Sequence, residues 1–142
     1  MDYYRNILIT GCSSGLGQAL FNRVWEDDTL TPFAHYRSEH GDPHALIGDI
    51  TDSDFPEKLD NHIRKYKIDC FINNAGVYEG DIIDTNLASQ IRILQVVYKY
   101  FLERERGRII NIHSVAGLYP SANESIYCAS KFGLKGFSKS IQ

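Results

Sequence analysis

Tyr127 and Lys131 lie four residues apart, and Ser114 precedes the tyrosine by thirteen residues. Side chains four residues apart on a helix project from the same face. An ammonium group beside a phenol stabilises the phenolate, which lowers the pKa of a tyrosine from its ordinary value of about 10. Such a tyrosine can transfer protons near neutral pH. Because most pairs with this spacing are only solvated helix surface, the rest of the chain has to supply the context.

A glycine-rich segment at residues 10–17, TGCSSGLG, joins an apolar strand at 7–9 to a helix predicted at 14–26. Glycines permit a tight turn and let backbone N–H groups approach a pyrophosphate, whose charge is stabilised at a helix N-terminus. The spacing differs from the common GxGxxG, and a plain glycine-rich connection is the alternative. The position between a strand and a helix favours a phosphate site. Its candidate residues are Gly11, Ser13, Ser14, Gly15, Leu16 and Gly17.

Short apolar strands alternate with longer helical patterns along the whole chain. Strands are predicted at 7–9, 32–36, 45–48, 68–72 and 108–113, and helices at 14–26, 52–66, 85–103 and from Tyr127 to Gln142. This order implies an α/β fold with a parallel sheet, right-handed crossovers and helices on both faces. No linker or repeat divides the chain, so we expect a single domain over residues 1–142.

Composition excludes several classes of protein. The chain has 142 residues, 43% of them hydrophobic, and a net charge of −3, which gives no electrostatic case for a nucleic-acid or membrane partner. The three cysteines, Cys12, Cys70 and Cys128, form no CxxC or Cys/His cluster. They indicate reduced thiols in a cytoplasmic protein and no metal site. Neither a signal-peptide core nor an apolar run of membrane-spanning length occurs in the sequence.

Taken in order, the motifs resemble those of the short-chain dehydrogenase/reductase family. The resemblance runs from about residue 5 to residue 142. It rests on residues 10–17, Asp49, the NNAG segment at 73–76, Asn86, Ser114 and the Tyr127–Lys131 pair. It implies a three-layer, Rossmann-type doubly wound sheet of which five strands are present and the usual sixth and seventh are missing. It also implies reversible hydride transfer between NAD or NADP and a small-molecule carbonyl or alcohol.

The resemblance implies roles for four catalytic residues. Tyr127 would donate the proton, Ser114 would hold the substrate oxygen, and Lys131 would tune the tyrosine and bond the nicotinamide ribose. Asn86 would hold a water that relays protons to the lysine. The alternatives are that Asn86 is a helix N-cap and Ser114 a strand-end cap. His113, beside the serine, is expected to point into packing or to the opposite face.

The same resemblance assigns the rest of the cofactor site. Asp49, with Ile50 after it, would contact the adenine ring, although Asp49 could instead only cap a helix. Asn74, Ala75 and Gly76 would let the backbone pass close to the cofactor. No acid precedes Glu39 at the end of the second strand, and Arg37 there suits the 2′-phosphate of NADP. The alternative is that Arg37 is an ordinary exposed arginine. NADP is therefore expected as the cofactor, and NAD remains possible.

Two departures from the family pattern qualify these expectations. Only nine residues separate Gly76 from Asn86, which shortens the rim of the substrate pocket. The chain also stops inside the catalytic helix, as the N-terminal portion of a longer protein or a reduced relative would. A non-catalytic dinucleotide-binding or sensing module is therefore the alternative function. The helix at 85–103 is apolar around most of its circumference, which together with the last helix predicts a homodimer or homotetramer.

Overall fold

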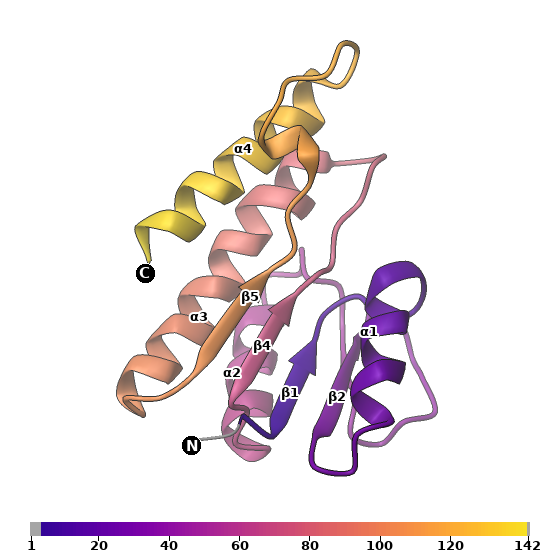
Figure 1. Cartoon of the computed structure of the whole chain (residues 1–142), viewed down its shortest axis with the longest axis vertical. Helices are drawn as coiled ribbons and strands as arrows, with labels where there is room; N and C mark the ends of the chain where they lie inside the picture. The colour runs from indigo at the N-terminus through magenta and orange to yellow at the C-terminus, as the bar shows by residue number, and fades with distance from the viewer. Residues whose placement is uncertain (1–3, 142) are drawn as a thin grey trace.

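The computed structural model describes residues 4–141. Strands and helices alternate as the sequence predicts (Figure 1). The elements are β1 (Asn6–Ile9), α1 (Gly15–Trp25), β2 (Thr31–Tyr36), β3 (Leu46–Ile47), α2 (Phe55–Lys65), β4 (Cys70–Asn73), η1 (Asp84–Ala88), α3 (Ser89–Glu103), β5 (Arg108–Asn111), η2 (Val115–Gly117) and α4 (Ser125–Ser140).

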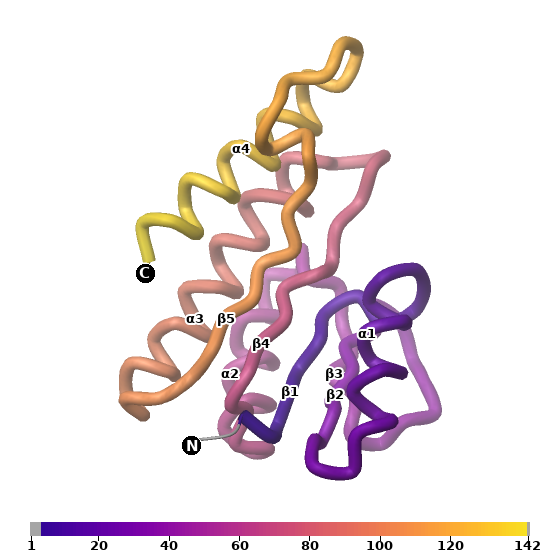
Figure 2. The backbone as a smooth tube through the Cα atoms, in the orientation of Figure 1, coloured from indigo at the N-terminus to yellow at the C-terminus, as the bar shows by residue number. Residues whose placement is uncertain are grey.

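The five strands form one parallel sheet in the order β3-β2-β1-β4-β5. Helix α1 lies on one face, and α2 and α3 cover the other, with α4 packed along α3 (Figure 1). The α/β, Rossmann-type prediction is therefore confirmed. Because all strands run in the same direction, the turns that follow β1, β4 and β5 all leave the sheet at the carboxyl ends of the strands (Figure 2).

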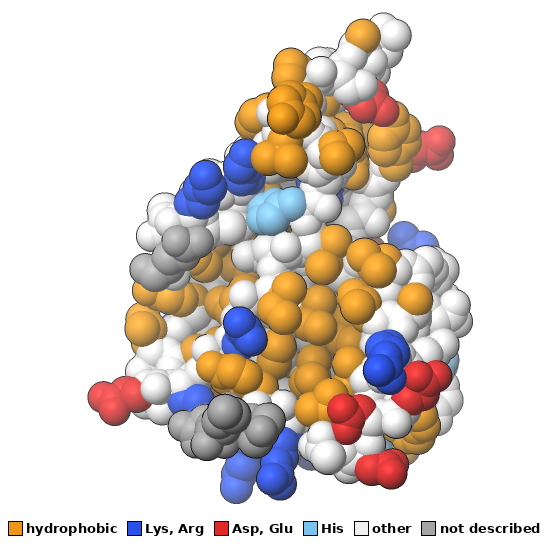
Figure 3. Space-filling view, viewed as in Figure 1, with side chains coloured by type: hydrophobic (Ala, Val, Ile, Leu, Met, Phe, Trp, Pro, Cys, Tyr) orange, Lys and Arg blue, Asp and Glu red, His pale blue; other side chains and the backbone are white. Residues whose placement is uncertain are grey.

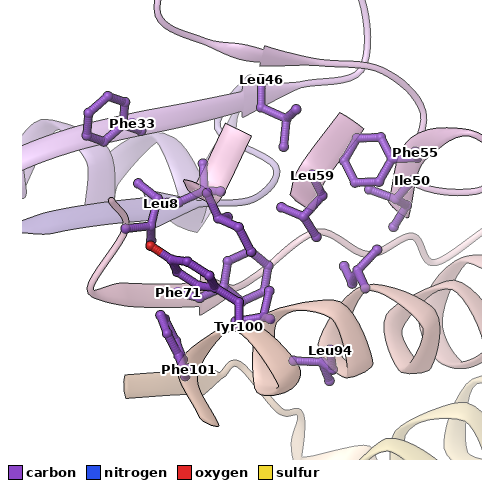
Figure 4. Packing of buried hydrophobic residues seen from close by; sticks show 14 of the residues in the cluster. Leu8, Phe33, Leu46, Ile50, Phe55, Leu59, Phe71, Leu94, Tyr100 and Phe101 are labelled. Atoms are coloured by element: carbon purple, nitrogen blue, oxygen red, sulfur yellow. The ribbon is translucent and has the colours of Figure 1, made fainter. Parts of the chain in front are cut away.

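Alternation along the strands builds a separate core on each face of the sheet. In β1, Leu8 points toward α2 and α3, where it joins Phe71, Leu59 and Leu94 in the larger core (Figure 4). Ile7 and Ile9 point toward α1. Each fully buried apolar side chain of this kind stabilises the fold by roughly 1.5–3 kcal/mol.

Helix α1 covers only part of its face of the sheet. Leu20 and Val24 pack against the strands, whereas Leu16 and Ala19, which share the predicted apolar face, are exposed. Ile110 in β5 also remains partly exposed, and hydrophobic side chains show on the surface beside α1 (Figure 3).

Several element boundaries differ from the predicted ones. The fourth strand is Cys70–Asn73 rather than 68–72, and the Asp69 carboxylate just before it accepts the N–H groups of Arg5 and Asn6. The helix predicted at 85–103 begins as a π-helical segment, η1, and becomes α-helical only at Ser89. Helix α4 begins at Ser125 and ends at Ser140, and Gln142 lies outside the described residues.

Across residues 4–141, no helix is long and apolar enough to cross a membrane. The same residues contain no group of three or more His, Cys, Asp or Glu side chains arranged to hold a metal ion.

Candidate functional site

A cleft of roughly 410 Å³ lies at the carboxyl ends of β1, β2 and β4. The structure brings most of the predicted cofactor residues to this cleft. They are Gly11, Ser13, Ser14, Leu16, Gly17, Arg37, Asp49, Ile50, Asn74, Ala75 and Gly76. Gly15, Tyr127 and Lys131 do not line it, although Lys131 reaches Gly76 at its end.

Two glycines make the turn after β1 possible. Gly11 has φ of +73°, and a Cβ on it would lie 3.0 Å from the Cα of Ala75. A Cβ on Gly17 would lie 2.1 Å from the carbonyl oxygen of Gly11, a distance that no side chain tolerates. The turn and the first turn of α1 therefore touch backbone to backbone, which shapes a concave cradle.

The N-terminus of α1 opens into this cradle. Ser14 occupies the N-cap position with extended backbone, but its side chain makes no capping hydrogen bond. The first N–H groups of a helix have no partner within the helix, and they carry the positive end of its dipole. The end of α1 is therefore suited to a phosphate group.

Thr10 and Asn74 join the turn after β1 to the turn after β4. The Thr10 hydroxyl accepts the N–H groups of Asn74 and Ala75 at 2.9 and 3.0 Å. In return, the Asn74 side-chain amide donates to the carbonyls of Thr10 at 2.9 Å and Gly11 at 3.3 Å. These bonds fix the floor of the cleft.

A second chain of amides fixes the strand ends beneath Ser114. The Asn73 amide donates to Asn111 at 3.0 Å, and the Asn111 amide donates to the hydroxyl of Ser138 in α4 at 3.1 Å. These bonds hold the carboxyl ends of β4 and β5 together and connect them to α4.

Asp49 and Arg37 line the side of the cleft that lies at the ends of β2 and β3. One oxygen of Asp49 accepts both the N–H and the hydroxyl of Thr51, at 2.9 and 2.8 Å. These bonds, with Arg37 nearby, lower the pKa of the Asp49 carboxyl. Asp49 thus caps the local turn, and its second oxygen remains available to a ligand. Arg37 is exposed at the cleft and forms no ion pair with any of the described residues.

Lys131 lies beneath the ring of Tyr127 on α4. Its ammonium nitrogen is 5.5 Å from the ring centroid, and the residue is only 9% exposed. Burial lowers the pKa of Lys131 because the charged form loses hydration. A Cβ on Gly76 would lie 3.5 Å from this nitrogen and 3.2 Å from Asn86 Oδ1, so the lysine and the asparagine meet at the same glycine.

Asn86 is fully buried, and its alternative assignment as a helix N-cap is wrong. It lies inside the π-helical segment η1, and both polar atoms of its side chain bond to the backbone of one residue, Val77. Asn86 Oδ1 accepts the N–H of Val77 at 2.8 Å, and Nδ2 donates to the carbonyl of Val77 at 2.6 Å. π-helical turns often mark functional positions. The structure thus gives Asn86 a positioning function, and its relay function stays a prediction.

Ser114 and His113 follow β5 and diverge. Ser114 Oγ accepts the N–H of Ala116 at 3.1 Å and caps the short η2 helix, which packs against α4. The hydroxyl hydrogen of Ser114 has no acceptor among the described residues and is therefore available to a ligand. His113 lies in a separate hollow with Tyr98 and Ser138.

Tyr78 covers Tyr127 from the shortened loop between Gly76 and Asn86. The two ring centroids are 5.0 Å apart with an angle of 58° between the rings. The Tyr78 hydroxyl donates to the carboxylate of Glu124, the N-cap residue of α4. Tyr78 thus covers one side of the Tyr127 ring. No motif surrounds Tyr78 in the sequence, so sequence reasoning did not identify it.

Other residues at the site also escaped sequence reasoning. Gln90 in α3 is buried and donates to the carbonyl of Ala75 at 2.7 Å. His35, Val77 and Thr85 line the cleft. Only His35 had a signal, since a histidine is unusual inside a buried apolar strand.

Comparison with known proteins gives a consistent result. The family model described as "short chain dehydrogenase" matches residues 5–142. The chain is 30% identical to the 3-oxoacyl-(acyl-carrier-protein) reductase of Escherichia coli, over 94% of this chain and 64% of that protein. It is 28% identical to the corresponding reductase of Mycobacterium avium, over 96% of this chain and 60% of that protein. The chain thus spans less than two thirds of the length of these relatives.

Solved structures agree with this result. An actinorhodin polyketide ketoreductase with NADPH superposes with a TM-score of 0.85 and 27% identity, over 97% of this chain and 64% of that one. A 4-hydroxyisoleucine dehydrogenase with NADH and succinate superposes with a TM-score of 0.81 and 28% identity, over 95% of this chain and 71% of that one.

Proposed function

The chain belongs to the short chain dehydrogenase family, and from this we propose that it is an NADP(H)-dependent oxidoreductase acting on a small-molecule carbonyl or alcohol. The observation that carries the proposal is the buried Lys131 beneath the Tyr127 ring, which adjoins the cleft lined by the glycine-rich turn after β1. An acid–base pair in that position serves a reaction in which a proton and a hydride are exchanged together. The similar reductases from Escherichia coli and Mycobacterium avium support a carbonyl substrate by their names.

The residues of the cleft fit a dinucleotide. Gly11 and Gly17 leave a cradle that a Cβ would fill, and the N-terminus of α1 faces it without a side-chain cap. A pyrophosphate there would accept hydrogen bonds from backbone N–H groups. Asp49 and Ile50 would contact the adenine, and Asn74, Ala75 and Gly76 would allow the cofactor to pass over β4.

NADP(H), when bound, supplies or accepts the hydride. The chain's own residues handle the proton and the substrate oxygen. Ser114 would orient the oxygen through its free hydroxyl hydrogen, and Tyr127 would give that oxygen its proton. Lys131 favours the phenolate that results and would bond the nicotinamide ribose. Asn86 would hold a water for proton return while it anchors Val77.

Arg37 favours NADP(H) over NAD(H). Its guanidinium is exposed at the cleft, and a guanidinium can bind a phosphate group through two hydrogen bonds. The two similar structures contain NADPH in one case and NADH in the other, so the 2′-phosphate contact is the deciding feature. We further propose a homodimer or homotetramer built on α3 and α4.

The test is a reduction assay with NADPH and a panel of simple ketones and 3-oxoacyl thioesters, followed at the absorbance of the reduced cofactor. Cofactor binding is measured in parallel through the fluorescence of NADPH. Turnover together with binding supports the proposal, and absence of both refutes it.

Binding without turnover would favour a dinucleotide-binding module instead. This second function is supported by one observation: the chain spans only 60–64% of the length of the two relatives described above. In that case Tyr127→Phe would leave NADPH binding unchanged, and addition of a ketone would not alter the affinity for NADPH.

A further inference from the structure

His35 is a buried histidine whose two ring nitrogens both have backbone partners. It is only 3% exposed at the end of β2. Its Nδ1 lies 3.1 Å from the backbone nitrogen of Gly11, and its Nε2 lies 2.8 Å from the carbonyl oxygen of Gly48. Because the Gly11 N–H can only donate and the Gly48 carbonyl can only accept, the pair of contacts requires a neutral imidazole with its proton on Nε2.

These contacts connect two walls of the cleft. Gly11 belongs to the glycine-rich turn, and Gly48 immediately precedes Asp49 on the adenine side. The carbonyl of His35 also accepts the N–H of Cys12 at 3.0 Å. One residue of β2 therefore holds the turn through two hydrogen bonds and the adenine wall through a third. The ring is fixed in turn by the edge-on contact with Phe55, with centroids 5.1 Å apart.

Protonation would break one of these connections. In the imidazolium ion both nitrogens donate, so Nδ1–H would face the Gly11 N–H. Burial opposes that change and lowers the pKa of His35. The hydrogen bond to the Gly48 carbonyl and the nearby Asp49 carboxylate favour the charged form, whereas a protonated His62 on α2 would repel it. Arg37, two residues further along the chain, also lines the cleft. Cys12 in the turn stays neutral, since burial raises the pKa of its thiol to about 11.

We propose that His35 is a positioning residue of the cofactor site, whose neutral imidazole holds the glycine-rich turn in the shape that binds a dinucleotide. The affinity for NADP(H) then falls when His35 is protonated, while the proton transfer at Tyr127 is untouched. This inference rests on the proposed function, because it assumes that the cleft binds a dinucleotide.

Two variants separate the two ring contacts. In His35→Asn the side-chain oxygen takes the place of Nδ1, so the Gly11 N–H keeps an acceptor that does not titrate. In His35→Gln the amide takes the place of Nε2, so the Gly48 contact is retained and the Gly11 acceptor is lost. His44→Gln, at an exposed histidine outside the cleft, is the matched control.

The experiment measures the dissociation constant of NADP⁺ between pH 8 and pH 5 by titration calorimetry. At pH 8 the Gln variant should bind about tenfold more weakly than the Asn variant, as expected for an unsatisfied backbone donor. Toward pH 5 the unmodified protein should lose affinity more steeply than the Asn variant. The 2′-phosphate itself titrates with a pKa of about 6, but it contributes equally to both proteins and cancels in the comparison.

If His35 only stabilised the fold, the variants would lose NADP⁺ affinity in parallel with folding stability, and the proposal predicts otherwise. Urea unfolding of the three proteins and the control should show losses of stability that do not track the loss of affinity. In turnover assays the Gln variant should raise the KM for NADPH and leave kcat nearly unchanged. Equal pH profiles for the unmodified protein and His35→Asn, or equal affinities of the Asn and Gln variants, would overturn the inference.

Failure of the proposed function gives a distinct result. In that case the unmodified protein does not bind NADP⁺ even at pH 8. The nitrogen chemical shifts of the imidazole, measured by NMR without any cofactor, then still test the arrangement. Protonation on Nε2, with the Gly11 amide signal shifting as His35 titrates, is the expected result, and a proton on Nδ1 contradicts it.

Discussion

Gly117 packs against the backbone of Lys131 in α4, while the side-chain nitrogen of Lys131 lies at the far end of the same residue. The nitrogen extends to Gly76, and a Cβ on Gly117 would lie 3.0 Å from the carbonyl oxygen of Lys131. The η2 segment that follows Ser114 is therefore packed directly against the helix that carries Tyr127. This contact couples the position of Ser114 to that of Tyr127 and Lys131, the three residues that we propose to act on the substrate.

The glycine cradle predicts a strong effect of a single methyl group. Gly17→Ala places a Cβ 2.1 Å from the carbonyl of Gly11, so the turn must shift. We expect the affinity for NADPH to fall more than tenfold, measured by cofactor fluorescence. Gly136→Ala is the matched control, since its added Cβ meets nothing within 4 Å and it should stabilise α4 by about 0.5–1 kcal/mol. Normal NADPH affinity of Gly17→Ala would show that the close packing of Gly17 against Gly11 does not shape the cofactor site.

Cofactor preference should follow the charge at position 37. The unmodified protein should bind NADPH more tightly than NADH, and Arg37→Asp should reverse the order, because a carboxylate repels the 2′-phosphate and accepts a ribose hydroxyl. Competition titrations with both cofactors give the comparison. Arg23→Asp, an equal change of charge on α1 outside the cleft, should leave the order unchanged. Equal affinities of the unmodified protein for the two cofactors would exclude this function of Arg37.

The parts predicted from the sequence are those with local causes. Residues 7–9 form a strand because they are apolar on both faces, and the glycines at 11 and 17 mark a turn by their type alone. The π-helical segment at Asn86 was missed, since its hydrogen bonds to Val77 depend on how the preceding loop returns. The function of His35 was hidden for the same reason, because its partner Gly11 is 24 residues away.

His62 predicts a dependence of stability on pH. Burial lowers its pKa from 6.5 to about 4, so between these values the unfolded chain binds a proton that the folded chain does not. Stability therefore decreases as the pH falls through this range, by about 2 kcal/mol between pH 7 and pH 5. Urea unfolding of the unmodified protein and His62→Gln at both pH values isolates this contribution. An equal loss in the two proteins would show that His62 is not its source.

Assembly should depend on the outer surfaces of α3 and α4. Leu102 and Phe132 are exposed there, which an isologous interface would cover. We expect light scattering to give at least twice the chain mass of 16.2 kDa, and Phe132→Glu to lower it. Trp25→Glu, at an exposed residue on α1, is the control and should leave the mass unchanged. A monodisperse monomer of the unmodified protein at micromolar concentration would reject the proposed oligomer.

We propose that Tyr127 supplies the proton for an NADPH-dependent carbonyl reduction, and the turnover number of Tyr127→Phe tests this function. Phenylalanine keeps the ring and its contacts with Lys131 and Tyr78 but has no transferable proton. Turnover should fall by roughly 10²–10⁴-fold, while NADPH affinity stays nearly unchanged. Tyr119→Phe, at an exposed tyrosine before α4, should retain full activity. A Tyr127→Phe protein that reduces the same ketone at close to the original rate would contradict the assignment.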